Sequence, residues 1–187
     1  MGFQWFPIPW IDGSSEEEAM AGMARAVEDL DAFLDALMVD EDLLPEQVVL
    51  FGFSQGTMMS LHVAPRREDE VAGVVGFSGR LLGPELLAVE VISRPPILLV
   101  HGDQDDVVPP VSLPAAAEAL QGAGWKEVAQ LFGTTWPSHA YSLDFCGLFS
   151  SLSKKPKTLP LKCRKRARFI SVQPFPQAYL LRIVSPE

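Results

Sequence analysis

Hydrophobic residues recur at spacings of three and four between residues 14 and 38, which predicts an amphipathic helix. The helix is expected to begin at Ser14 and Ser15, because serine is a favourable N-cap residue and three glutamates follow in the first turn. The predicted apolar face contains Met20, Met23, Val27, Leu30, Leu34 and Leu37, widened by Phe33.

Shorter apolar runs follow this helix. Residues 48–53 are almost uninterruptedly apolar, which is typical of a strand buried on both faces of a parallel sheet. Further strands are predicted at 71–77, 97–100 and 128–132, and further helices between Ser54 and Pro65 and over 112–121. Strands separated by helices predict an α/β fold of right-handed β-α-β units, with about four mostly parallel strands flanked by helices.

Charge divides the chain into two parts. Residues 1–150 contain 6 basic and 23 acidic residues, whereas residues 151–187 contain 9 basic residues and a single acid, Glu187. We therefore expect one globular domain over 1–149 and a basic tail over 150–187 that is disordered or poorly packed. Such a tail attracts phosphates, so an anionic-surface binder is one alternative, but no motif for reading nucleic acid accompanies it.

The two cysteines, Cys146 and Cys163, form no C-x-x-C pair and are too few for a disulfide framework. No apolar run is long enough to span a membrane, and the N-terminus has no basic region of a signal peptide. These features predict a cytoplasmic protein without a membrane span.

The candidate chemistry begins at Gly52-Phe53-Ser54-Gln55-Gly56, a G-x-S-x-G pentapeptide that directly follows the strand over 48–53. A sharp strand-to-helix turn lifts such a serine out of the sheet, and Gly52 and Gly56 keep the turn free of Cβ clashes. The turn also directs the backbone N–H of Gln55 toward a developing oxyanion. Ser54 is therefore the predicted nucleophile.

A serine nucleophile needs a base and an acid that orients the base. The loop after the third strand contains Asp103, Asp105 and Asp106, of which Asp105 is the candidate acid. His139 is the only histidine further along the chain and is the candidate base, whereas His62 and His101 are expected to be structural.

The arrangement resembles the phospholipase/carboxylesterase family of α/β-hydrolases, which includes the acyl-protein thioesterases. The resemblance rests on the pentapeptide, on Phe77-Ser78-Gly79 and on the run from His101 to Pro109. It implies that Asp105, the first aspartate of the D-x-V-V-P element, is catalytic. It also implies a Ser-His-Asp hydrolase of small acyl esters, lysophospholipids or thioesters that needs no metal or organic cofactor.

The sequence departs from this family in three places. Ser138 replaces the glycine that usually precedes the histidine, the tail does not match, and the family's first strands and His-Gly oxyanion loop have no counterpart before residue 14. Loss of an oxyanion donor costs roughly a hundred- to a thousandfold in turnover. An impaired remnant or interaction module is therefore the alternative. An exposed edge on the strand over 48–53 would invite a homodimer.

Overall fold

The computed structural model describes residues 4–133 and 168–172, and its centre is a parallel sheet of five strands. The strands are β1 (Val48–Phe53), β2 (Gly73–Phe77), β3 (Ile97–Gly102), β4 (Ala129–Gly133) and β5 (Arg168–Val172). They lie in the order β4-β3-β2-β1-β5, and each neighbouring pair is parallel. The predicted α/β class is confirmed, with one strand more than expected.

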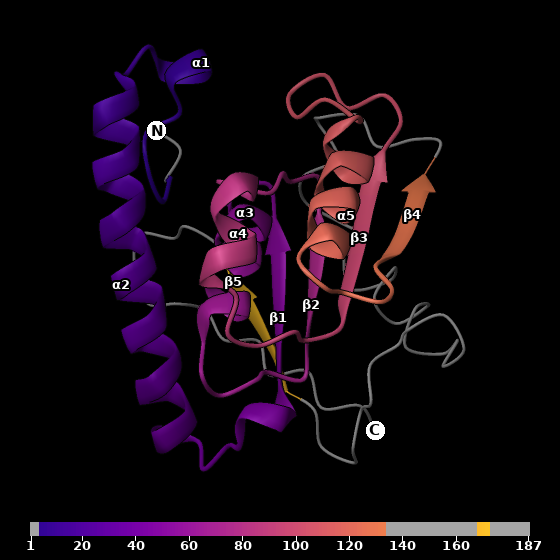
Figure 1. The fold of residues 1–187 in the computed structure, drawn as a ribbon. Coiled ribbons are helices and arrows are strands. Elements are labelled where there is room, and N and C mark those ends of the chain that lie inside the picture. Colours follow the sequence, from indigo (N-terminus) through magenta and orange to yellow (C-terminus); the bar gives the residue numbers. More distant parts are fainter. Residues whose placement is uncertain (1–3, 134–167, 173–187) are drawn as a thin grey trace.

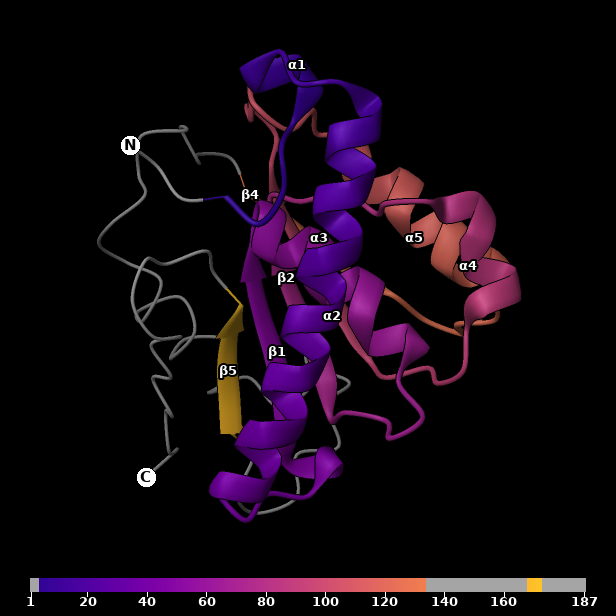
Figure 2. The ribbon, with the colours of Figure 1, turned by 90° about the vertical axis from the view of Figure 1, so that its left-hand side faces the viewer.

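The helices connect the strands along the chain. They are α1 (Pro9–Asp12), α2 (Glu16–Asp40), α3 (Gln55–Val63), α4 (Pro84–Glu90) and α5 (Ser112–Gly122), with short 3-10 turns at Pro45–Gln47 and Ala64–Arg66. Side chains from α2, α3, α4 and α5 join those of the strands in one large core. Figures 1 and 2 show these helices gathered on one side of the sheet, with α2 beside α3 at the left-hand side of Figure 1.

The second face of the sheet has a smaller apolar cluster. It contains Val49, Val75, Phe77, Leu98 and Val100, with Phe51 and Phe53 packed against it. Because alternate residues of a strand point to opposite faces, the continuous apolar runs fill both clusters. This double burial explains why the strands read as unbroken hydrophobic runs.

Helix α2 begins as predicted but buries a different face at its start. The Ser15 hydroxyl accepts a hydrogen bond from the Glu18 N–H at 3.1 Å, while the Glu18 carboxylate accepts one from the Ser15 N–H at 2.8 Å. The expectation that Met20 joins the apolar face is wrong, because its side chain is 72% exposed. Gly22 faces inward instead, since a Cβ there would lie 2.7 Å from Cδ of Pro7.

Strand β5 corrects two expectations. Residues 168–172 belong to the basic tail, yet they pair in parallel with β1 from Val48 to Gly52 and bury Ile170 and Val172. The expected absence of packed structure therefore does not hold for these five residues. Strand β1 has a neighbour on each side, so the exposed edge that suggested a homodimer is covered. Phenylalanine, isoleucine and valine favour strands, a signal that the surrounding lysines and arginines obscure.

Candidate active site

Ser54 lies between the carboxyl end of β1 and the first residue of α3. Its backbone has φ 50° and ψ −116°, a conformation that residues with a Cβ rarely adopt. The Ser54 N–H donates to the Phe77 carbonyl oxygen at 2.9 Å, and its own carbonyl accepts from the Met58 N–H at 3.1 Å. These bonds hold the strained turn between β2 and α3, at the end of the sheet to which the strand arrows point in Figure 1.

Close backbone packing makes the turn possible. A Cβ at Gly52 would lie 2.3 Å from the carbonyl carbon of Gly56, so strand and helix touch at a distance that only glycine allows. The Thr57 hydroxyl lies 2.8 Å from the carbonyl oxygens of Gly52 and Phe77 and accepts from the Phe77 N–H at 2.8 Å. Thr57 thereby links β1, β2 and α3 directly below Ser54.

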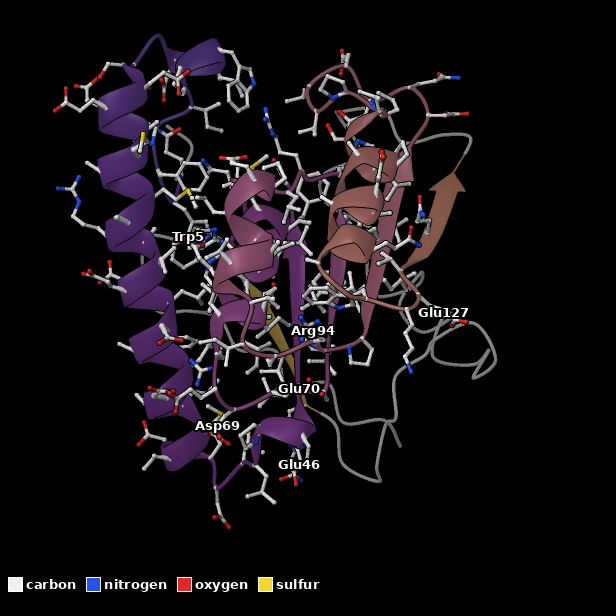
Figure 3. The ribbon with its side chains drawn as sticks, viewed as in Figure 1. Trp5, Glu46, Asp69, Glu70, Arg94 and Glu127 are labelled. Atoms are coloured by element: carbon white, nitrogen blue, oxygen red, sulfur yellow. The ribbon has the colours of Figure 1, made fainter. Side chains whose placement is uncertain are left out.

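Gln55 has a second role that the sequence did not predict. Its side chain is buried and bridges to a segment about fifty residues earlier: the amide oxygen accepts from the Trp5 N–H at 2.8 Å, and the amide nitrogen donates to the Phe6 carbonyl at 2.7 Å. Figure 3 shows Trp5 between α2 and α3. The backbone N–H of Gln55 is at the start of α3, where N–H groups have no acceptor within the helix.

Asp105 is held more firmly than its neighbours in the loop after β3. One carboxylate oxygen accepts from the N–H groups of Val107 and Val108 at 3.0 and 2.9 Å, and the side chain is 10% exposed. Asp103 and Asp106 are exposed. The second oxygen of Asp105 lies 3.5 Å from Nε2 of His101.

His101 is buried at the end of β3, and its Nε2 lies 2.9 Å from the Val108 carbonyl oxygen. With a proton on Nε2, His101 would donate a hydrogen bond to the Val108 carbonyl and so tie the end of β3 to the loop that contains Asp105. This contact is of the structural kind expected for His101. His62 lies in the last turn of α3, where burial, aided by Arg66 and opposed by Glu90, lowers its pKa to about 4.

The remaining predicted site residue, His139, lies outside the described residues. The structure therefore brings Ser54 and Asp105 to the same edge of the sheet without testing the third member of the predicted triad. Among the described residues, no cluster of three potential metal ligands occurs, and no helix is both long and apolar enough to cross a membrane.

A serine at a strained strand-to-helix turn of a parallel sheet is typical of the α/β-hydrolase fold. Solved structures with this fold resemble the chain. Esterase PE8 is 34% identical with a TM-score of 0.67, covering 83% of this chain and 70% of that one. Arabidopsis thaliana SOBER1 is 25% identical with a TM-score of 0.62, covering 83% and 73%.

Residues 1–141 match the model of the phospholipase/carboxylesterase family, and the chain belongs to that family. Acyl-protein thioesterase 1 of Gibberella zeae is 33% identical over 92 residues, covering 46% of this chain and 39% of the relative. Acyl-protein thioesterase 1 of Saccharomyces cerevisiae is 29% identical over 108 residues, covering 56% and 47%. The matched segments thus span less than half of each curated relative.

Proposed function

We propose that the protein is a serine hydrolase of carboxylic esters or thioesters, with Ser54 as nucleophile. The observation that carries the proposal is the backbone of Ser54, whose positive φ persists because β2, α3 and the Gly52–Gly56 contact hold it. Strain of this kind costs roughly 1–3 kcal/mol and gathers at functional sites. Membership of a family of esterases supports the same reaction class.

In the proposed reaction, the Ser54 hydroxyl oxygen attacks the acyl carbonyl carbon while His139 takes the hydroxyl proton. The Gln55 N–H donates to the oxyanion that forms on the carbonyl oxygen. Collapse of this intermediate breaks the ester or thioester bond, and His139 gives its proton to the leaving alcohol or thiol. Water then attacks the acyl-serine by the same route, releasing the acid and restoring Ser54.

Asp105 is the carboxylate proposed to orient His139. Its contacts support this choice over Asp103 and Asp106, because two backbone N–H groups fix one of its oxygens and the other lies 3.5 Å from Nε2 of His101. Hydrogen bonds of this kind fix the orientation of the carboxylate, which a triad acid needs in order to orient its histidine. The exposed Asp103 and Asp106 side chains have more freedom to turn into water.

The family description and the names of the relatives support carboxylic esters and thioesters as substrates, and we propose small acyl esters, lysophospholipids and thioesters. We also propose a cytoplasmic location, because the two cysteines are too few for a disulfide framework. No metal or organic cofactor takes part in the proposed steps. The alternative proposal is a catalytically impaired remnant or an interaction module. Among the described strands β4 and β5 lie at the two edges of the sheet, and the proposed homodimer would pair through one of them.

Labelling with a fluorophosphonate probe distinguishes an active serine hydrolase from an impaired remnant or interaction module. Wild type is compared with Ser54→Ala, His139→Ala and Asp105→Asn, with Asp103→Asn and Asp106→Asn as matched controls, and each variant is also assayed on a p-nitrophenyl ester. We expect labelling to require Ser54 and turnover to fall by about 10⁴-fold in Asp105→Asn but less than threefold in the two controls. A folded wild type that neither labels nor turns over ester would contradict the hydrolase proposal.

A further inference from the structure

Arg80 is an exposed cation placed beside the candidate nucleophile. It follows Ser78 and Gly79 at the carboxyl end of β2, and a Cβ on Gly79 would lie 3.0 Å from the Ser54 carbonyl oxygen. Consecutive Cα atoms are about 3.8 Å apart, so the backbone of Arg80 begins one residue away from that contact. Its side chain is therefore attached at the rim of the site that holds Ser54.

Trp10 fixes the direction of the Arg80 side chain. The guanidinium carbon lies 5.3 Å from the centre of the Trp10 ring, within the range of a cation–π contact. Trp10 belongs to α1, and Asp12 anchors that short helix by accepting hydrogen bonds from the N–H groups of Ile8 and Ser14 at 2.9 and 3.0 Å. The Trp10 side chain is 55% exposed, so the stacked pair faces solvent.

Stacking uses the face of a guanidinium and leaves its edge of N–H donors available. In the part of the chain that the structure describes, no carboxylate lies within ion-pair distance of Arg80. Other arginines are engaged differently: Arg66 pairs with Glu90, Arg67 with Asp31 and Asp35, and Arg94 donates to the Ala123 carbonyl. Figure 3 shows Arg94 near Glu70, away from the carboxyl ends of the strands.

We propose that Arg80, held over Trp10, binds a carboxylate or phosphate group of the substrate and so determines specificity for anionic acyl esters. The inference rests on the proposed hydrolase function and deepens it. A guanidinium edge matches both anions with two parallel hydrogen bonds. The acidic body of the protein, with 23 acids against 6 bases over residues 1–150, repels anions in general, so a local cation is needed to accept one.

The test compares each anionic ester with a neutral partner of similar shape. One pair is para-acetoxybenzoate and para-acetoxybenzamide, and the other is butyrylglycerol phosphate and butyrylglycerol. The quantity measured is the ratio of kcat/KM for the anionic ester to that for the neutral ester, in wild type, Arg80→Gln and Arg25→Gln. Arg25 is exposed on α2 and has the same charge, so Arg25→Gln measures the effect of losing one positive charge away from the proposed subsite.

We expect the ratio to fall about three- to tenfold in Arg80→Gln and less than twofold in Arg25→Gln, with turnover of the neutral esters unchanged. A fall for the benzoate alone assigns a carboxylate, and a fall for the phosphate alone assigns a phosphate. An unchanged ratio, or equal falls in the two variants, overturns the inference.

If wild type turns over neither the neutral nor the anionic esters, the hydrolase proposal fails, and Arg80 is then tested by binding alone. Saturation-transfer NMR compares benzoate with benzamide, and glycerol phosphate with glycerol, on the same three proteins. Loss of anion binding confined to Arg80→Gln supports the subsite, and anion binding that is absent or unaffected in this variant rejects it.

Discussion

Gly52 and Gly56 touch through their backbones at the turn that holds Ser54, with only 2.3 Å between an added Gly52 Cβ and the Gly56 carbonyl carbon. The main chain fixes the position of a Cβ, and the Gly56 carbonyl carbon belongs to the main chain, so no side-chain rotation can relieve the overlap. We expect Gly52→Ala to separate β1 from α3 and to lower the free energy of unfolding by about 3 kcal/mol or more. Urea unfolding followed by circular dichroism measures this change.

Gly122→Ala is the matched control for this substitution. Gly122 is the last residue of α5 and is exposed, and an added Cβ would meet nothing within 4 Å. Alanine favours helix over glycine, so this variant should be unchanged or stabilised by up to about 1 kcal/mol. Equal stabilities of the two variants would show that the tight turn does not form.

The Gln55 amide is expected to hold the segment around Trp5 and Phe6 onto α3. Gln55→Leu removes both partners from these backbone groups and should cost about 1–3 kcal/mol. Hydrogen exchange by mass spectrometry should show faster exchange over residues 4–13. Gln121→Leu, an exposed change on α5, serves as control, and identical exchange in wild type and both variants would reject the anchoring role.

His62 should make the protein less stable in mild acid. In the unfolded chain histidine binds a proton near pH 6.5, whereas in the folded protein the lowered pKa of about 4 delays this binding. Between pH 6.5 and 4 the unfolded state therefore binds more protons, and stability falls as the pH falls.

His62→Gln removes this difference. Because the His62 side chain is partly solvated, we expect the contribution to be only about 1 kcal/mol, growing as the pH is lowered from 7 to 4.5. Urea midpoints of both proteins at several pH values measure it. Parallel pH profiles for wild type and variant would contradict the prediction.

Strand β5 should contribute to stability in proportion to the side chain that it buries. Ile170 is 1% exposed in the large core, so Ile170→Val should cost about 0.5–1.5 kcal/mol and Ile170→Ala about 2–5 kcal/mol. Thermal unfolding gives the order of the two. Val89→Ala, at an 86% exposed position on α4, should change stability by less than about 0.5 kcal/mol. Equal stabilities of Ile170→Val, Ile170→Ala and Val89→Ala would mean that β5 is not packed against the core.

Local signals in the sequence predicted much of the fold and part of the site. The run from Val48 to Phe53 and the Ser54 turn were predictable because the strand, the glycines and the helix start are adjacent in the chain. Asp105 could be proposed from its loop, but only its hydrogen bonds to Val107 and Val108 distinguish it from the neighbouring aspartates.

Contacts between distant segments had no such local signal. Gln55 meets Trp5 and Phe6 across about fifty residues, and nothing in the periodicity marks that pairing. Met20 fits the helical spacing of the apolar face, but Phe6 and Pro7 pack beside Gly22 and turn the buried face away from it. Ile170 was hidden by the basic residues around its strand, because composition over a window averages out a short apolar run.

The position of β5 in the chain also constrains how the protein is made. Ribosomes add about 5–20 residues per second, so on the order of ten seconds separate the synthesis of β1 from that of β5. Once β4 has been made, the nascent sheet has all its other described strands but still lacks the one that pairs with the outer side of β1. The pairing of β1, the strand that leads into the candidate nucleophile, is therefore completed last, and chaperone capture during translation would act on that open side.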